Sequence, residues 1–203
     1  MDDNLNWNDH ITYVKNKISK IIAMLSQVKR NFPLPLKIMM FKGLLMPHLL
    51  YCLPIFGHSK QINTLLKCQK WALRTITKTH WKSHTDKIFL KFNILKIPDL
   101  YQLSVCTIIR KRISNYGPKL LQDIYEYKDR RNIHYITTTK SVSKRMDNFP
   151  NHLFPKIWNS HNKLDLRPTY HSYKSQLKLA LLENYNTKCH KPNCFNCKVT
   201  SFK

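Results

Sequence analysis

Apolar residues recur every three or four positions over residues 8–28, and this spacing predicts an amphipathic helix. Asn8 or Asp9 can cap its first turn. Basic residues occupy the rest of its surface and follow its last turn, where positive charge suits the helix dipole. The residues predicted to face a core are Ile11, Val14, Ile18, Ile21, Ile22, Leu25 and Val28.

Residues 36–57 are hydrophobic nearly all round and therefore predict a central, buried helix. Most of this stretch is apolar enough to suggest a membrane span. Lys42 lies within it, however, and Pro47 and Pro54 interrupt the helical backbone. These features favour a core helix with a break or kink near Pro47, and they argue against a membrane partner.

A third helix is predicted over residues 60–78, KQINTLLKCQKWALRTITK. Gln69 lies in the middle of its apolar face, so that a buried amide there needs hydrogen-bond partners nearby. The apolar face is formed by Ile62, Leu65, Leu66, Leu73 and Ile76. The opposite face carries a stripe formed by Lys60, Thr64, Lys67, Trp71, Arg74 and Lys78.

Two interpretations of this basic stripe are open. A run of lysine and arginine is most often a solvated helix face, and a connecting segment can cover an aromatic ring. Trp71 favours a binding role, because a large ring among cations usually packs or stacks on something. Bases stacked on aromatic rings beside phosphate-binding cations are typical of nucleic-acid binding.

The remaining sequence predicts further helices and one extended segment. Short helices are expected after Thr85 and over 120–127, with a longer helix from Ile97 to about Ser114. Residues 130–148 have no helical period and predict an extended or loop segment with a short strand near 134–138, and helices follow near 149–158 and after Thr169 or Ser172. The predicted fold is mainly α: an N-terminal three-helix bundle, then further helices, a short extended segment and a Cys-rich tail. The predicted regions are 1–78, 79–128, 129–187 and 188–203.

Net charge is the strongest compositional signal. Thirty-five Lys and Arg against 11 Asp and Glu leave a formal charge of +24 over 203 residues. Such an excess repels itself in a compact chain, and a polyanionic partner relieves this repulsion. A second basic patch is predicted from Arg110, Lys111, Arg112, Arg130 and Arg131.

The cysteines divide into two groups. Cys52, Cys68 and Cys106 stand singly in apolar runs, where a free thiol behaves as a small hydrophobic group. Without a secretory leader or an evenly spaced disulfide framework, an intracellular location, nuclear or cytoplasmic, is expected. The other cysteines lie in the C-terminal segment CHKPNCFNC, which offers a zinc site formed by Cys189, His190, Cys194 and Cys197. Adjacent Cys and His rarely reach one tetrahedral centre, so a tail without zinc is the alternative.

No constellation of catalytic residues is visible. Nucleotidyl transfer needs carboxylates gathered around two metal ions, whereas the acidic residues here are scattered singly apart from Asp2-Asp3. No predicted strand precedes that pair, and three glycines cannot form a phosphate-binding loop. The chain by itself is therefore not expected to be an enzyme.

Several blocks, in this order and spacing, resemble a known family. They are LNWNDHITYVKNKISKIIAML, FPLPLKIMMFKGLLMPHLLYCLPIFG, LLKCQKWALRTIT, SHTDKIFLKFNILKIPDLY, NYGPKLL, KIWNSHNKLDLRP and YKSQLKLALLENY. Over residues 4–186 the chain is similar to the region after the polymerase palm in LINE-type, non-LTR retrotransposon reverse transcriptases, which are RNA-directed DNA polymerases.

The resemblance implies a thumb, which is a helical bundle that grips the template–primer duplex, and then a connector that leads to a Cys/His-rich element. Three groups of residues match recurrent family positions that are not catalytic. They are Trp7, His10 and Ile11; Gln69, Lys70 and Arg74; and Trp158 and Asn159. The chain departs from the family in lacking the endonuclease, the palm and its Asp-Asp, in carrying Phe56-Gly57 where relatives often have Trp-Gly, and in having too few tail ligands for a complete zinc knuckle.

The function expected from charge, stripe and resemblance is non-catalytic binding of RNA, DNA or an RNA–DNA hybrid by a C-terminal fragment of such an enzyme. Alternatives are also open. The chain can act with a palm-containing polymerase chain, it can be a non-functional retroelement remnant, or it can be a basic domain that binds an acidic protein.

Overall fold

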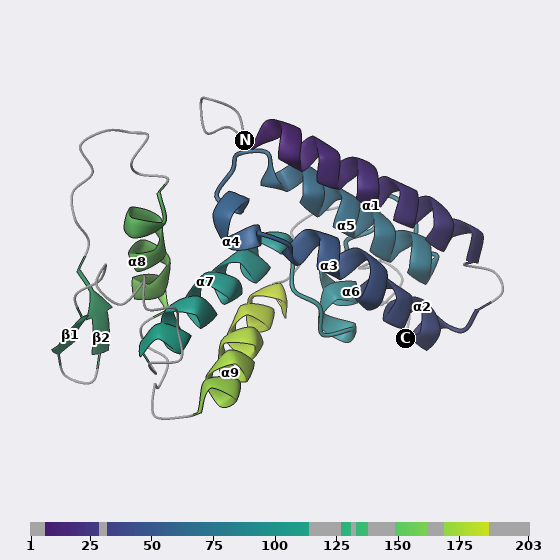
Figure 1. Ribbon diagram of the computed structural model, residues 1–203. Coiled ribbons are helices and arrows are strands. Elements are labelled where there is room, and N and C mark those ends of the chain that lie inside the picture. Colours follow the sequence, from purple (N-terminus) through teal and green to yellow (C-terminus); the bar gives the residue numbers. More distant parts are fainter. Residues whose placement is uncertain are drawn as a thin grey trace. The chain divides into compact units, whose positions relative to one another are not determined.

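The computed structural model describes residues 7–28, 32–113, 127–130, 133–137, 149–161 and 169–186 (Figure 1). In these residues the protein is mainly helical, as predicted, with a two-stranded sheet. The chain forms two compact units, Met1–Pro98 with Leu181–Lys203, and Asp99–Ala180. These limits differ from the predicted regions, since the end of the last helix returns to the first unit.

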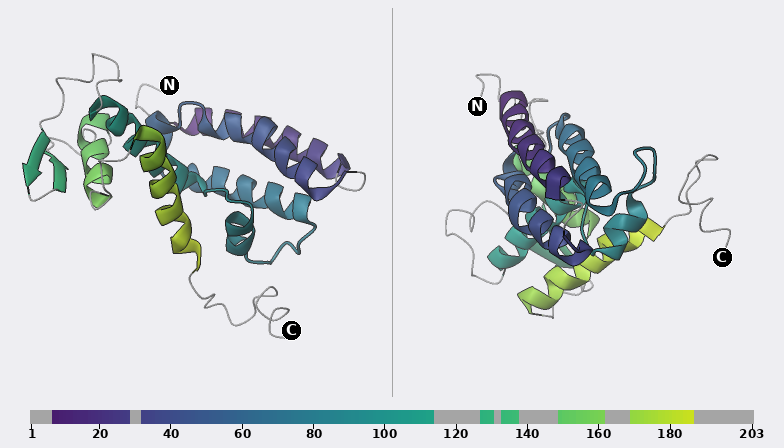
Figure 2. Two further views of the ribbon diagram at one scale, coloured as in Figure 1. Left: turned by 90° about the horizontal axis from the view of Figure 1, so that it is seen from below. Right: turned by 90° about the vertical axis from the view of Figure 1, so that its right-hand side faces the viewer.

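The first unit is built on α1 (Asn8–Val28) and α5 (Ile62–Thr77), which pack against each other along their apolar faces. Figure 1 and the right-hand view of Figure 2 show the two helices side by side. Ile18 and Ile22 of α1 and Leu65 and Leu73 of α5 are completely buried. The helical periodicity in the sequence therefore identified the core faces of both helices.

A helical rod beside them consists of α2 (Leu34–Met40), the π-helical turn η1 (Phe41–Leu45) and α3 (Met46–Leu50). Pro47 has no N–H to donate to the carbonyl group one turn earlier, and the wider π turn directly before α3 accommodates this missing hydrogen bond. The helix therefore widens near Pro47 and does not break there, so of the predicted break or kink the break is excluded. It ends at Tyr51, because Cys52 takes a left-handed conformation with φ of 53°, and α4 (Leu53–Phe56) follows.

Gln69 forms the polar contact that the sequence required of it. Its side chain is completely buried in α5, where Nε2 donates to the Leu95 carbonyl oxygen (2.9 Å) and Oε1 accepts from the Ile97 N–H (3.2 Å). Both partners are backbone groups of buried residues. Leu95 lies between α6 (Asp86–Lys91) and α7 (Ile97–Ile113), and Ile97 is the first residue of α7. One amide thereby fixes the path of the chain after α6.

The end of α9 (Tyr170–Glu183) and the 3-10 turn η4 (Asn184–Asn186) complete the first unit. The Tyr185 hydroxyl accepts a hydrogen bond from the Lys96 N–H (2.9 Å), and its ring lies edge-on to Phe89. The Lys96 ammonium group lies 4.2 Å from the centroid of that ring and forms a 3.0 Å ion pair with Asp86. These contacts attach a distant segment of the sequence to α6.

The second unit contains most of α7 and α9, the strands β1 (Tyr127–Arg130) and β2 (Ile133–Ile136), and α8 (Pro150–Ser160). The strands pair antiparallel, with Tyr127 opposite Ile136. The Asn159 side chain of α8 forms two hydrogen bonds with the backbone of Ile136: its Oδ1 accepts from the N–H, and its Nδ2 donates to the carbonyl oxygen. Trp158 packs on Tyr173 of α9, with 5.9 Å between ring centroids.

Candidate nucleic-acid interface

The solvent face of α5 carries the central part of the predicted stripe. Trp71 is 53% exposed, and Lys67, one turn earlier, is also exposed. Lys60 and Lys78 are exposed but lie outside the helix, in the preceding turn and at the C-terminal cap. More than half of the Trp71 side chain is exposed, so an aromatic surface and a nearby ammonium group are available together on α5.

Arg74 does not belong to this free surface. Its guanidinium group is partly buried and donates two hydrogen bonds to the Ser83 carbonyl oxygen, from Nε (3.2 Å) and from Nη2 (2.9 Å). Burial lowers the pKa of this side chain from its ordinary value. The predicted phosphate ligand is therefore engaged in holding the segment after α5 against the helix.

The segment held by Arg74 carries exposed residues that the predicted site did not include. Trp81 is 71% exposed, the Lys82 ammonium group lies 4.8 Å from the centroid of its ring, and the His80 ring centroid is 5.8 Å away. The sequence interpretation treated residues 79–83 as a linker. The triplet HWK was the available signal, because it places an aromatic residue between two basic groups outside any apolar pattern.

The second predicted basic patch does not form a surface as expected. Arg110 is 9% exposed and Arg112 is 4% exposed, so neither guanidinium group is available at the surface. Lys111 is exposed, and its ammonium group lies 5.2 Å from the centroid of the Tyr170 ring. Arg130 lies in β1, but its side chain and the whole of Arg131 are outside the described residues.

The predicted likeness to reverse transcriptases also singled out Trp7, His10 and Ile11, and all three pack within the first unit. Ile11 is a core residue of α1, and the His10 ring lies edge-on to Phe56, with 4.9 Å between centroids. Trp7 approaches the same phenyl ring at 6.5 Å. Phe56, the predicted departure from the tryptophan of those enzymes, is thus a buried residue against which the start of α1 packs.

The predicted zinc ligands Cys189, His190, Cys194 and Cys197 lie outside the described residues. Among the residues that the structure does describe, no three His, Cys, Asp or Glu side chains are arranged to hold a metal ion. Cys106 is completely buried beside Tyr173, and burial raises the pKa of its thiol to about 12. Within the same described ranges, no helix is both long enough and apolar enough to cross a membrane.

Comparison of the chain with protein-family models, with curated proteins and with solved structures finds no match. The likeness to retrotransposon reverse transcriptases therefore stays a prediction based on the order and spacing of the sequence blocks.

Proposed function

We propose that this chain is a non-catalytic nucleic-acid-binding module, with the role of the thumb and connector of a non-LTR retrotransposon reverse transcriptase. In this role it grips an RNA, DNA or RNA–DNA hybrid duplex through the phosphate backbone. It supplies no catalytic residue, and polymerisation is the task of a palm-containing partner chain.

The observation that carries the proposal is the pairing of Trp71 with Lys67 on the solvent face of α5. The buried face of the same helix packs on α1, so the exposed face is held by a rigid element. A base or sugar can stack on the indole ring while the ammonium group contacts the adjacent phosphate.

The segment after α5 supports the same function. Arg74 fixes this segment, which presents Trp81 with Lys82 beside its ring. The interface thus has two aromatic surfaces, and its exposed cations are Lys60, Lys67, Lys78 and Lys82. The overall charge of +24 adds a long-range attraction for any polyanion.

Binding to an RNA–DNA hybrid with a single-stranded overhang, measured by fluorescence anisotropy at several salt concentrations, tests the proposal. If the four lysines each contact one phosphate, log K falls with log salt at a slope of about −3 to −4. Lys67→Ala is expected to make this slope shallower by about 1 for every sequence tested. Trp71→Ala is expected to weaken binding about 5- to 100-fold, whereas Trp71→Phe retains most of the stacking.

Lys20→Ala is the matched control, because Lys20 is an exposed lysine on α1 and its replacement removes the same charge outside the interface. An equal loss in Lys20→Ala and Lys67→Ala would show only a general charge effect. A flat salt dependence would refute phosphate-led binding, and a loss confined to one sequence would contradict backbone contact. Displacement of the hybrid by an acidic protein at an equal charge concentration would favour a protein-interaction domain instead.

A further inference from the structure

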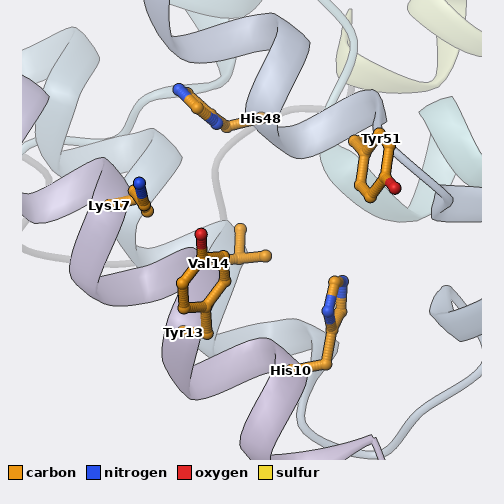
Figure 3. A pocket seen from close by; sticks show the side chains of 6 residues that line it. All are labelled: His10, Tyr13, Val14, Lys17, His48 and Tyr51. Carbon is orange, nitrogen blue, oxygen red and sulfur yellow. The ribbon is translucent and has the colours of Figure 1, made fainter. Parts of the chain in front are cut away.

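A pocket of about 430 Å³ lies between α1 and α3, apart from the surface of α5 discussed above (Figure 3). Its volume falls within the range of about 300–1,000 Å³ that is usual for small-molecule sites. The residues that line it are His10, Tyr13, Val14, Lys17, His48 and Tyr51.

The local structure explains why these side chains meet. The four lining residues of α1 are spaced by three, one and three positions, which places them on one face of a helix. His48 and Tyr51 are likewise three positions apart, and Tyr51 is the last residue before the left-handed turn at Cys52. Figure 3 shows Lys17 and His48 at one end of the pocket, with His10 and Tyr51 at the other.

The floor of the pocket is packed, and its walls are open to solvent. Val14 is buried, and His10 is wedged against Phe56 and Trp7. In contrast, Tyr13 is 58% exposed and Tyr51 is 69% exposed. Two aromatic rings are therefore available for stacking above a floor that does not need to rearrange.

The chemistry of the lining favours an anion that carries a flat ring. Among the described residues that line the pocket there is no carboxylate, whereas the Lys17 ammonium group, the imidazoles and the phenolic hydroxyls all offer hydrogen-bond donors. The Lys17 Nζ lies 5.4 Å from the centroid of the Tyr13 ring, so that a cation and a stacking surface adjoin. A purely apolar ligand would strip water from these polar groups without replacing their hydrogen bonds.

We propose that this pocket binds one nucleotide, with its phosphate beside Lys17 and His48 and its base stacked on Tyr13 or Tyr51. The same chemistry is offered by a free nucleotide and by an unpaired nucleotide of a single strand. The proposal does not depend on whether the face of α5 binds a duplex, because none of the lining residues lies on α5.

Titration of the whole chain with AMP, with adenosine and with inorganic phosphate tests the pocket, with amide NMR shifts to locate binding and calorimetry to measure it. AMP is expected to bind at least about tenfold more tightly than either of its parts, and to shift the amide signals of residues 13, 17, 48 and 51. Lys17→Ala and Tyr51→Ala are each expected to weaken AMP binding about fivefold or more. Both side chains are exposed, so these variants are expected to keep the fold.

Lys15→Ala is the matched control, since Lys15 is an exposed lysine on the same helix that does not line the pocket. Equal weakening by Lys15→Ala and Lys17→Ala would overturn the proposal, and so would AMP binding no tighter than phosphate binding when a single-stranded oligonucleotide also leaves these amides unshifted. A single-stranded oligonucleotide that shifts the same amides when AMP does not would identify the strand as the source of the nucleotide. AMP binding that persists in Trp71→Ala separates this site from the α5 interface, so that either proposal can fail alone.

Discussion

Replacement of Gln69 by leucine tests the buried hydrogen bonds that join α5 to the chain before α7. Leucine fills a similar volume but cannot donate to the Leu95 carbonyl or accept from the Ile97 N–H. Each buried backbone group that loses its partner costs about 1–3 kcal/mol, and the added apolar contact recovers about 1–2 kcal/mol. The middle values of these ranges leave an expected loss in the free energy of unfolding of about 2–3 kcal/mol.

Urea unfolding followed by circular dichroism measures this loss. With a slope of about 2 kcal/mol per molar urea, the midpoint is expected to fall by about 1–2 M. Gln27→Leu is the matched control, because Gln27 is exposed on α1 and the same substitution there is expected to change stability by at most about 0.5 kcal/mol. A loss in Gln69→Leu no larger than in Gln27→Leu would refute the assignment of a stabilising role to this amide.

Gln69→Glu gives a second, pH-dependent test of the same contact. A carboxylate can accept from the Ile97 N–H, but its other oxygen then faces the Leu95 carbonyl in a buried site. Burial raises the pKa of such a carboxyl group above its unfolded value near 4.3. The contribution of this group to stability is therefore complete below that value and is lost as the pH rises through the folded-state pKa. A stability difference between Gln69→Glu and Gln69→Leu that is constant from pH 4 to pH 8 would contradict this reasoning.

Two further outcomes are expected. Lys78 caps α5 in a left-handed conformation with φ of 54°, so Lys78→Gly should be about 1 kcal/mol more stable than Lys78→Ala in urea unfolding. Both variants should weaken nucleic-acid binding equally, because both remove the same charge. Equal stability of the two variants would show that the turn carries no strain. Burial lowers the pKa of His161, so the stability gained from its neutral form is complete above its ordinary pKa of 6.5 and is lost as the pH falls through the lower folded-state value. His161→Gln should then lose less stability than the original chain between pH 7 and pH 5, and an NMR titration midpoint of His161 above 6.5 would exclude this explanation.

The periodic apolar positions predicted much of the helical fold. The core face of α1 and the extent of α7 agree with the three- and four-residue spacing, because burial of one face dominates helix packing. The need of Gln69 for partners was also predictable, since a polar group in an apolar face must be satisfied when buried. Its partners were not predictable, because they are backbone atoms 26 and 28 positions further along the chain.

For the candidate interface, helical spacing predicted only part of the arrangement. Helical spacing placed Trp71 and Lys67 on the outer face of α5, where both are exposed. The same spacing could not show that the Arg74 guanidinium group donates its hydrogen bonds to the Ser83 carbonyl oxygen. It also could not show that Arg110 and Arg112 are buried, or that Trp81 is exposed beside Lys82. In each case the deciding partner is supplied by another segment.

The sequence by itself determined that this protein is a basic, mainly helical chain and which faces of its principal helices are apolar, because these properties depend on composition and on local periodicity. Only the tertiary structure decided which cations remain free and that α1 and α3 meet around a pocket. These features depend on contacts between groups from distant segments of the chain, and a local sequence pattern does not predict such contacts.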